Sequence, residues 1–468
     1  MVTSGAVAPE QADVGLTVLQ PSRATVMIKP VGALCNLDCT YCYYLPTKEV
    51  FGGRERRMSL STLESVFAGL LPHFDDTVNV VWQGGEPTLA GLEFFRKGIE
   101  YVQRHARPGQ QVAFALQTNC TLLDDDWCRY LRQYKYLVGA SVDGPPEMHD
   151  HYRLTNRGAG SSGKVLRGIN RLREHGVEYN LLCVLNDRNV HYPDEVWKYL
   201  MTLGTPWLQF IPAIEWERDP SRPGRNVLAP YSPDPVAYGR FLCSVFDRWF
   251  ERHRDRVSVR IFDAILHKLV LDVTPFCILD GSCHNQLTVE HDGSVFGCDH
   301  FIERRWQLAD LGDPDWTNDT DIGGDRHVGL TFHGSGMSKR ETHDGRHIDD
   351  ASHVASADRT GDRIGDGAGD GAGDGGRPEA DWLRRVDERR LGSFAERKQR
   401  LPASCVSCAY KPYCHGGCPK HRELGGDVPE ATVLCEAYQM FFKHAMPRMN
   451  WLASFLKRGE QPPPPRRR

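Results

Sequence analysis

The stretch CNLDCTYCYY holds three cysteines, Cys35, Cys39 and Cys42, at the spacing C-x-x-x-C-x-x-C. Thiolates this close together can bind one iron–sulfur cluster, and a cluster of four irons has four corners for ligands. Because the loop supplies only three thiolates, one iron keeps an open position that can bind an outside molecule. The loop therefore predicts a cluster that takes part in a reaction. A structural zinc site is the alternative, and it is disfavoured because zinc half-sites usually read C-x-x-C.

More cysteines gather later in the chain, at Cys277, Cys283, Cys298, Cys405, Cys408, Cys414, Cys418 and Cys435. These thiolates suffice for two further sites of four ligands each. The total of 15 cysteines is odd, and clustered thiols in a reducing compartment are metal ligands more often than disulfides. Three others, Cys128, Cys183 and Cys243, lie within helix or strand patterns and are predicted to be buried thiols.

Composition and charge limit the function classes. The chain has 468 residues, 40% of them hydrophobic, and a net charge of -4. This balance shows no basic excess that would suit nucleic acid or an anionic membrane. No stretch has the apolar length of a membrane span, and the first residues lack the basic and apolar regions of a signal peptide. We therefore expect a cytoplasmic monomer that binds neither nucleic acid nor membrane.

Short β-branched runs alternate with helix-like segments along the first half of the chain. The predicted strands cover residues 24–31, 78–82, 111–117, 136–142, 179–185 and 207–211. A helix is expected from Ser59, with Ser61 and Glu64 forming a capping box. Strands that recur with helices between them indicate βα units and a parallel sheet, which closes into a barrel or part of one. In such folds the site lies at the C-terminal ends of the strands, and the cysteine loop follows the first strand.

The same patterns divide the chain into parts. A loose tail is expected at 1–22 and a barrel at 23–255. A cysteine-rich domain is expected in two halves, 256–312 and 381–458, with a disordered insertion between them at 313–380. A Pro/Arg tail at 459–468 ends the chain given. The insertion is rich in Gly and Asp and poor in large apolar residues, so it cannot offset its ordering entropy by burial. Just before it, a hairpin is expected to turn at His291, Asp292 and Gly293.

Two other strand ends carry residues that suit ligand binding. The second strand ends in WQGGEPT, with Gly84, Gly85 and Glu86 at the turn. Glycines let the backbone approach a ligand closely, and a carboxylate beside them can receive an ammonium group. The fourth strand ends at Ser141, followed by Asp143. All these residues are expected at the edge of the sheet where the cysteine loop lies.

At these residues the chain resembles the radical S-adenosylmethionine (SAM) enzymes, whose cysteine loop has this spacing with an aromatic residue, here Tyr41, before the third cysteine. The resemblance implies an α/β fold with a partial (β/α)6 barrel of the TIM type, and a four-iron, four-sulfur cluster on the three loop cysteines that binds SAM. It also implies SAM contacts by Gly84, Gly85, Glu86, Ser141 and Arg153. The first three of these would hold the amino group and the last two the carboxylate, with turn and surface roles as the alternative for the last two.

The later cysteines resemble those of the SPASM domain, a C-terminal extension of some radical SAM enzymes that holds two auxiliary four-iron, four-sulfur clusters. In that pattern the ligands interleave, with Cys277, Cys283, Cys298 and Cys418 on one cluster and Cys405, Cys408, Cys414 and Cys435 on the other. Both clusters are then fully ligated by protein. A closed shell favours electron transfer or structural support over substrate binding.

The resemblance narrows to the anaerobic sulfatase-maturating enzymes through CNLDCTYCYYL, VWQGGEPTLAGLEFF, SVDG, EHDGSVFGCDHF and CHGGCPKHR. It implies oxidation of a Cys or Ser of a sulfatase motif to Cα-formylglycine, started by an adenosyl radical that removes hydrogen from Cβ. Asp299 would be the base, and Tyr44 and Gln83 would line the peptide pocket. Structural roles are the alternative for these three residues. The implied partners are an unfolded or nascent sulfatase chain and an electron donor such as flavodoxin or ferredoxin.

Two features depart from that family, and two rival functions stay open. Cys120 stands where the family usually has glycine, and the insertion interrupts the SPASM cysteines.

One rival function is that of another SPASM enzyme, which forms a thioether, a carbon–carbon link or an epimer in a small ribosomal peptide. Such enzymes often carry an added peptide-recognition domain, for which we expect no room because the barrel begins near Ala24. The other rival is a cysteine-rich scaffold with structural zinc.

Overall fold

The computed structural model describes residues 24–53, 57–74, 77–222, 226–283, 286–313, 388–422 and 430–465. In this part of the chain the largest sheet has ten strands in the order β11-β8-β7-β5-β4-β3-β1-β12-β13-β14. Its parallel body consists of β1, β3, β4, β5, β7 and β8, which span Ala24–Ile28, Thr77–Trp82, Gln111–Thr118, Leu137–Ser141, Glu178–Leu185 and Trp207–Pro212. Each coincides with a predicted strand, so the predicted parallel sheet is confirmed.

Helices connect successive strands of this body. They include α2, α3, α4, α6 and α7, which span Leu60–Leu70, Leu92–His105, Asp125–Gln133, Ser162–Glu174 and Pro193–Met201. Their buried faces share one core with the strands. Trp82 at the end of β3, for example, is fully buried, and its ring lies 4.8 Å from Phe95 of α3 and 6.3 Å from Phe67 of α2, measured between centroids. This alternation of strand and helix is the expected partial (β/α)6 barrel.

The capping box predicted at Ser61 and Glu64 is wrong. The N-cap of α2 is Ser59, whose hydroxyl oxygen accepts the Thr62 N–H at 3.0 Å. The Glu64 carboxylate instead lies 3.4 Å from the His105 ring nitrogen at the end of α3. Serine is a good cap at either position, and the pattern of apolar residues does not separate two serines so close together.

The hairpin predicted at residues 291–293 is present, since β12 (Gln286–Val289) and β13 (Ser294–Phe296) are antiparallel. Strand β12 also lies parallel to β1. The cysteine-rich half of the chain therefore continues the barrel sheet. In the loop after β13, the Asp299 carboxylate lies 3.6 Å from the ammonium of Lys29, the residue that follows β1.

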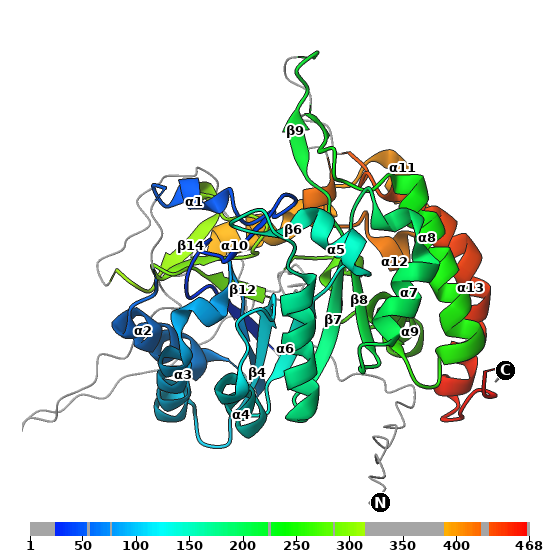
Figure 1. Ribbon diagram of the computed structural model, residues 1–468. Helices are drawn as coiled ribbons and strands as arrows, with labels where there is room; N and C mark the ends of the chain where they lie inside the picture. Colours follow the sequence, from blue (N-terminus) through cyan, green and yellow to red (C-terminus); the bar gives the residue numbers. More distant parts are fainter. Residues whose placement is uncertain are drawn as a thin grey trace, which may run out of the picture.

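The last helix, α13 (Cys435–Lys457), packs along α8 (Pro235–Arg248) and α9 (Arg260–Leu271) at one side of the molecule (Figure 1). The Phe441 ring of α13 stacks on Phe262 of α9, with centroids 5.5 Å apart. This packing fixes the C-terminal cysteines relative to the barrel, because Cys435 is the first residue of α13.

Some predicted parts lie outside the described residues. These are the tail at 1–22, the insertion at 313–380 apart from its first residue, the start of the segment 381–458 and the last three residues. Among the helices that are described, none combines the length and the apolar character that crossing a lipid bilayer requires.

Candidate active site

The predicted cluster loop lies at the C-terminal end of β1. Within it, β2 (Leu37–Cys39) pairs antiparallel with β6 (Arg153–Thr155), so Cys39 lies opposite Arg153. The Cys42 N–H donates to the Cys39 carbonyl at 2.9 Å. All three loop thiols are free, and burial raises the pKa of Cys35 and Cys39 to about 12. Three free thiols on one short, hydrogen-bonded loop are the donor set that an iron–sulfur cluster requires.

The spacing of the cysteines bears on the kind of metal site. Among the described residues, no three Cys, His, Asp or Glu side chains converge closely enough to hold a single metal ion. The ligands of a cubane cluster bind separate iron corners, so they stand farther apart than the ligands of one ion.

The second glycine of the β3 end fixes the cysteine loop in place. The Gly85 N–H donates to the Gly32 carbonyl at 2.8 Å, and the Glu86 N–H donates to the Leu34 carbonyl at 2.9 Å. A Cβ on Gly85 would overlap the Leu34 carbonyl oxygen. Only glycine permits this approach, and the contact holds the segment that leads directly into Cys35.

The Glu86 carboxylate is buried and bonded by its own chain. Its Oε1 accepts hydrogen bonds from Thr88 Oγ1 at 2.6 Å and Thr118 Oγ1 at 2.9 Å, and its Oε2 accepts the Asn119 N–H at 2.9 Å. Burial raises the pKa of Glu86, while these hydrogen bonds oppose the rise. The side chain thus ties the end of β3 to the end of β4. The predicted contact of this turn with the SAM amino group stays a prediction.

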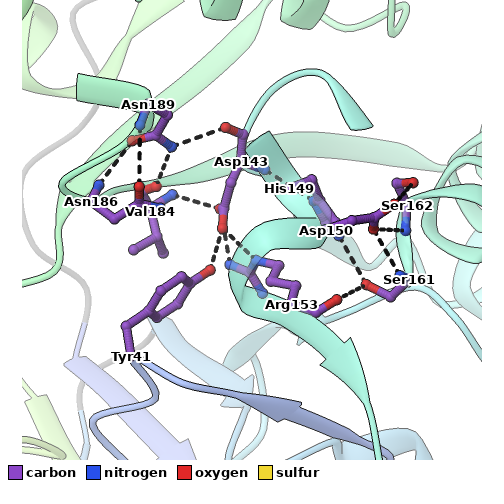
Figure 2. A network of polar contacts seen from close by, with 10 residues as sticks. All are labelled: Tyr41, Asp143, His149, Asp150, Arg153, Ser161, Ser162, Val184, Asn186 and Asn189. Atoms are coloured by element: carbon purple, nitrogen blue, oxygen red, sulfur yellow. Dashed lines mark hydrogen bonds and ion pairs between the residues drawn. The ribbon is translucent and has the colours of Figure 1, made fainter. Parts of the chain in front are cut away.

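Asp143, just beyond the end of β5 at Ser141, is the centre of a buried polar network (Figure 2). Arg153 donates to both carboxylate oxygens, from Nε at 2.8 Å and from Nη2 at 3.2 Å. The Tyr41 hydroxyl donates to the same carboxylate, and the Val184 N–H donates to Oδ1 at 2.9 Å. The network therefore joins the cysteine loop to the ends of β5 and β7. Ser141 itself is half-buried, and its contact with SAM stays a prediction.

Further hydrogen bonds hold the two charged groups of this network. Burial lowers the pKa of His149 to about 4, so the neutral ring accepts the Asp143 N–H at Nδ1, 3.3 Å away. Asn189 donates to the Asp143 carbonyl at 3.0 Å, and Ser161 Oγ donates to the Arg153 carbonyl at 2.7 Å (Figure 2). The Arg153 guanidinium binds both carboxylate oxygens of Asp143. Its predicted contact with the SAM carboxylate stays a prediction.

We expect Arg153→Met to lower the free energy of unfolding by about 3–5 kcal/mol, because it leaves a buried carboxylate without its cation. The side chains of Arg153 and Asp143 are 9% and 1% exposed, so water has little access to replace the lost partner. Urea unfolding measures the change. Adding Asp143→Asn should restore part of the stability, since the buried charge is then gone. Equal stability of the wild type and Arg153→Met would contradict this account.

A second polar cluster surrounds Asp299, the residue after Cys298. The Tyr43 hydroxyl donates to Asp299 Oδ2 at 2.6 Å, and the Gln83 amide donates to the Tyr43 oxygen at 3.2 Å. The Lys29 ammonium lies 3.6 Å from the same Oδ2 and donates to Gln83 Oε1 at 3.2 Å. These four side chains, which we call the Asp299 cluster, meet where β1 and β3 end.

The surroundings of Asp299 favour its ionised form. Burial acts to raise the pKa of this carboxyl, but the charges of Lys29 and His300 and the hydrogen bond from Tyr43 place it well below its ordinary value. Burial and the charge of Asp299 raise the pKa of Tyr43, whose hydroxyl therefore stays a donor. A carboxylate held in this way can receive a proton from a group that comes within hydrogen-bond distance.

Of the two residues predicted to line the peptide pocket, Gln83 belongs to the Asp299 cluster and Tyr44 packs behind it. Tyr44 is 2% exposed, and its hydroxyl donates to the buried Glu290 carboxylate at 2.6 Å. The Lys29 ammonium lies 4.2 Å from the centre of the Tyr44 ring. Tyr44 therefore contacts Lys29 and is almost closed to solvent. Both peptide contacts stay predictions.

The structure brings the later cysteines together in two sets. The first set consists of Cys277, Cys283, Cys298 and Cys418. Burial raises the pKa of each of these thiols, and the charge of at least one other thiol of the set adds to the rise. In the second set, burial raises the pKa of Cys405, Cys414 and Cys435, and charges of thiols in the same set, Cys408 included, add to the rise. All of these thiols are free. Each set therefore offers four thiols in one neighbourhood, and their assignment as cluster ligands stays a prediction.

Tyr438 of α13 neighbours both sets. It is 2% exposed, and its hydroxyl finds no hydrogen-bond partner within the described residues. Burial raises the pKa of Tyr438, and the charges of Cys414, Cys418 and Cys277 add to the rise. Buried hydroxyls are normally hydrogen-bonded, so an orphaned one beside thiols of both sets fits an acceptor that a bound cluster would supply.

Cys120, the departure from the family pattern, adopts a left-handed backbone with φ of 60° and is fully buried. Its main chain lies against Gly168 of α6, where an added Cβ would overlap the Cys120 carbonyl oxygen. A left-handed conformation suits glycine, which accounts for the usual residue at this position. The thiol is accommodated here and lies 3.7 Å from the Thr118 carbonyl oxygen.

The sequence patterns single out neither Lys29 nor Tyr43. A signal for Lys29 exists, because a lysine that continues a strand expected to be buried on both faces needs a counter-charge. For Tyr43 there is none. Tyr43 and Tyr44 are adjacent and of one type, and nothing local indicates which hydroxyl meets Asp299.

Comparisons of the sequence and of the structure with known proteins all find radical SAM proteins, among them anaerobic sulfatase-maturating enzymes. The sequence model of the radical SAM superfamily matches residues 30–200. The chain is 28% identical to a serine-type anaerobic sulfatase-maturating enzyme of Bacteroides thetaiotaomicron, over 93% of each chain. It is 29% identical to a cysteine-type anaerobic sulfatase-maturating enzyme of Clostridium perfringens, over 92% of this chain and 99% of the relative. Among solved structures, native anSMEcpe with bound AdoMet and Cp18Cys peptide aligns with a TM-score of 0.71 at 28% identity, over 92% of this chain and 99% of the other.

Proposed function

The chain belongs to the radical SAM superfamily and is a relative of the anaerobic sulfatase-maturating enzymes, and from this premise we propose that it oxidises a Cys or Ser of a sulfatase polypeptide to Cα-formylglycine. One observation carries the proposal. Tyr43 directly follows the loop cysteine Cys42 and donates to Asp299 at 2.6 Å. A loop suited to start radical chemistry therefore lies next to a carboxylate suited to complete an oxidation.

The residues of the site account for each part of the change. Cys35, Cys39 and Cys42 would hold the cluster that binds SAM, and this group would supply the one-electron chemistry that removes a hydrogen atom from the substrate Cβ. The substrate must then lose one proton and one electron to form C=S or C=O. Asp299 receives the proton of the thiol or hydroxyl. Cys298, whose Sγ lies 3.6 Å from Asp299 Oδ1, would help to hold an auxiliary cluster, and that cluster would accept the electron. From a Cys substrate, water then releases hydrogen sulfide, so both substrates give the same aldehyde.

The proposal sets the cofactors and partners. Three four-iron, four-sulfur clusters and SAM are required, with the loop cysteines and the two later sets as ligands. The substrate must present its side chain to Asp299, which is 8% exposed, so an unfolded or nascent chain suits the site better than a folded sulfatase. An electron donor such as flavodoxin or ferredoxin supplies the electron that cleaves SAM. We place the reaction in the cytoplasm, where thiols stay reduced.

The test is anaerobic incubation of the reconstituted protein with SAM, a reductant and synthetic sulfatase-motif peptides that contain Cys or Ser. Mass spectrometry should show a Cys peptide ~18 Da lighter or a Ser peptide ~2 Da lighter, with deoxyadenosine released. The product should also react with an aldehyde-selective hydrazine, which separates it from a cross-linked peptide. Deoxyadenosine without an aldehyde on either peptide would contradict the proposal.

A further inference from the structure

Lys29 is a fully buried lysine at the end of β1, with 0% exposure. A buried ammonium group is costly unless a counter-charge and hydrogen bonds compensate it. Here Asp299 Oδ2 lies 3.6 Å away and Gln83 Oε1 lies 3.2 Å away. The Tyr44 ring covers the ammonium from another side, with its centre 4.2 Å from Nζ, an arrangement that attracts a cation. The positive charge of Lys29 is therefore buried within the Asp299 cluster and does not face solvent.

The main chain of Lys29 is equally fixed. Its N–H donates to the Val289 carbonyl of β12 at 2.9 Å, and its carbonyl accepts the Gly32 N–H at 3.3 Å. The side chain thus starts from a point where β1, β12 and the cysteine loop meet. Because this main chain is fixed, the Lys29 ammonium is held in one position relative to Asp299 and Gln83.

Lys29 closes a ring of four side chains. Gln83 Oε1 accepts a hydrogen bond from Lys29, and the Gln83 amide N–H donates to the Tyr43 oxygen, so both ends of the amide fix its orientation. Tyr43 in turn donates to Asp299, which pairs with Lys29. Each group in the ring has one arrangement that satisfies its neighbours.

The ring treats the two oxygens of Asp299 differently. Lys29 and Tyr43 both contact Oδ2, at 3.6 Å and 2.6 Å. Within the described residues, Oδ1 has no hydrogen bond as short as the one from Tyr43: Gln286 Nε2 lies 3.4 Å from it and Cys298 Sγ lies 3.6 Å from it. A cysteine that ligates iron has no thiol proton to donate. Oδ1 is therefore the oxygen left for a proton from outside.

We propose that Lys29 is a positioning residue for the oxidation, which holds Oδ2 of Asp299 together with Gln83 and so presents Oδ1 to the thiol or hydroxyl of the substrate. This inference rests on the proposed function. Lys29 acts after the hydrogen atom has left Cβ. Its loss therefore uncouples aldehyde formation from deoxyadenosine formation.

Lys29→Met tests this, since methionine is also unbranched and removes the charge. Deoxyadenosine and aldehyde are measured in the same anaerobic reactions with the Cys peptide. Wild type should form them in equal amounts, and Lys29→Met should lower the aldehyde formed per deoxyadenosine by about tenfold or more. Asp299→Asn should uncouple the products as well. The double variant should be no worse than Asp299→Asn alone, because residues that act as one unit are not additive.

A second measurement follows stability instead of activity. Lys29→Met should lower the urea midpoint of the reconstituted protein, and the shift should be smaller in the Asp299→Asn background, where no buried charge is left unpaired. The exposed pair Lys97 and Glu100, whose charged atoms lie 2.8 Å apart, is the matched control. Neutralising both of its members should give shifts that simply add.

The outcomes separate the inference from the proposed function. If wild type forms no aldehyde, the proposed function fails, and the stability measurement still reports whether Lys29 and Asp299 act as a pair. If Lys29→Met lowers deoxyadenosine and aldehyde together at the wild-type ratio, its role is structural and the inference is overturned. Equal urea shifts with and without Asp299→Asn would overturn it as well.

Discussion

Asp299→Asn is expected to lower the rate of aldehyde formation by about 10²–10⁴-fold, the usual contribution of a general base, and to leave SAM cleavage in place. The amide keeps the shape of the carboxylate, and its oxygen can still accept the Tyr43 hydroxyl, which lies 2.6 Å away in the wild type. An amide does not take up the proton of a thiol at neutral pH. Lys29, 3.6 Å away, also loses its counter-charge, which disturbs the ring that it closes.

Deoxyadenosine and aldehyde are again measured together, and Asp263→Asn in α9 is the matched control. Asp263 accepts a hydrogen bond from Ser258, and loss of hydration raises the pKa of this half-buried carboxyl to about 7. An amide oxygen can still accept the hydrogen bond from Ser258, so Asp263→Asn changes little there. The control should form both products in wild-type amounts. Aldehyde formation at the wild-type rate by Asp299→Asn would mean that another group receives the proton.

The barrel could be predicted because strands that are buried on both faces leave a strong local signal. The run at 78–82 is short and β-branched, and the Trp82 that ends it is fully buried. The pairing of β12 with β1 could not be predicted. These strands lie far apart in the sequence, and hydrogen bonds between distant segments leave no pattern in either one. Without that pairing, the position of Asp299 beside the end of β1 stays hidden.

The site shows the same limit at the level of single residues. The spacing of the cysteines predicts how many sites they can form, and the resemblance to the SPASM domain implies which thiols share a site. It does not predict what holds them. From the sequence, Arg153 is expected to bind the carboxylate of SAM. In the folded chain its Nε donates to the carboxylate of Asp143, 2.8 Å away. Polar residues that converge from several strand ends satisfy one another, and the sequence does not reveal which of them remain for a ligand.

Gly85→Ala is expected to abolish SAM cleavage, because the added methyl group meets main chain and not a side chain that can turn away. Its Cβ would overlap the Leu34 carbonyl oxygen and would lie 2.5 Å from the Leu34 carbonyl carbon and 2.8 Å from that of Ala33. One segment must therefore move, and a shift of about 1 Å at a reacting site can cost about 10²-fold in rate. Leu34 directly precedes Cys35, so the shift moves the first cluster ligand.

Iron content and SAM-dependent deoxyadenosine formation measure the effect, with Gly163→Ala in α6 as the matched control. The nearest atom to a Cβ on Gly163 is Arg167 Nη1, at 4.0 Å, and alanine favours a helix over glycine by about 1 kcal/mol. The control should be fully active and slightly more stable. Gly85→Ala should lose about one cluster in three, since the two later cysteine sets do not depend on the loop. SAM cleavage at the wild-type rate by Gly85→Ala would mean that the cluster holds its place without the contact between the end of β3 and the segment before Cys35.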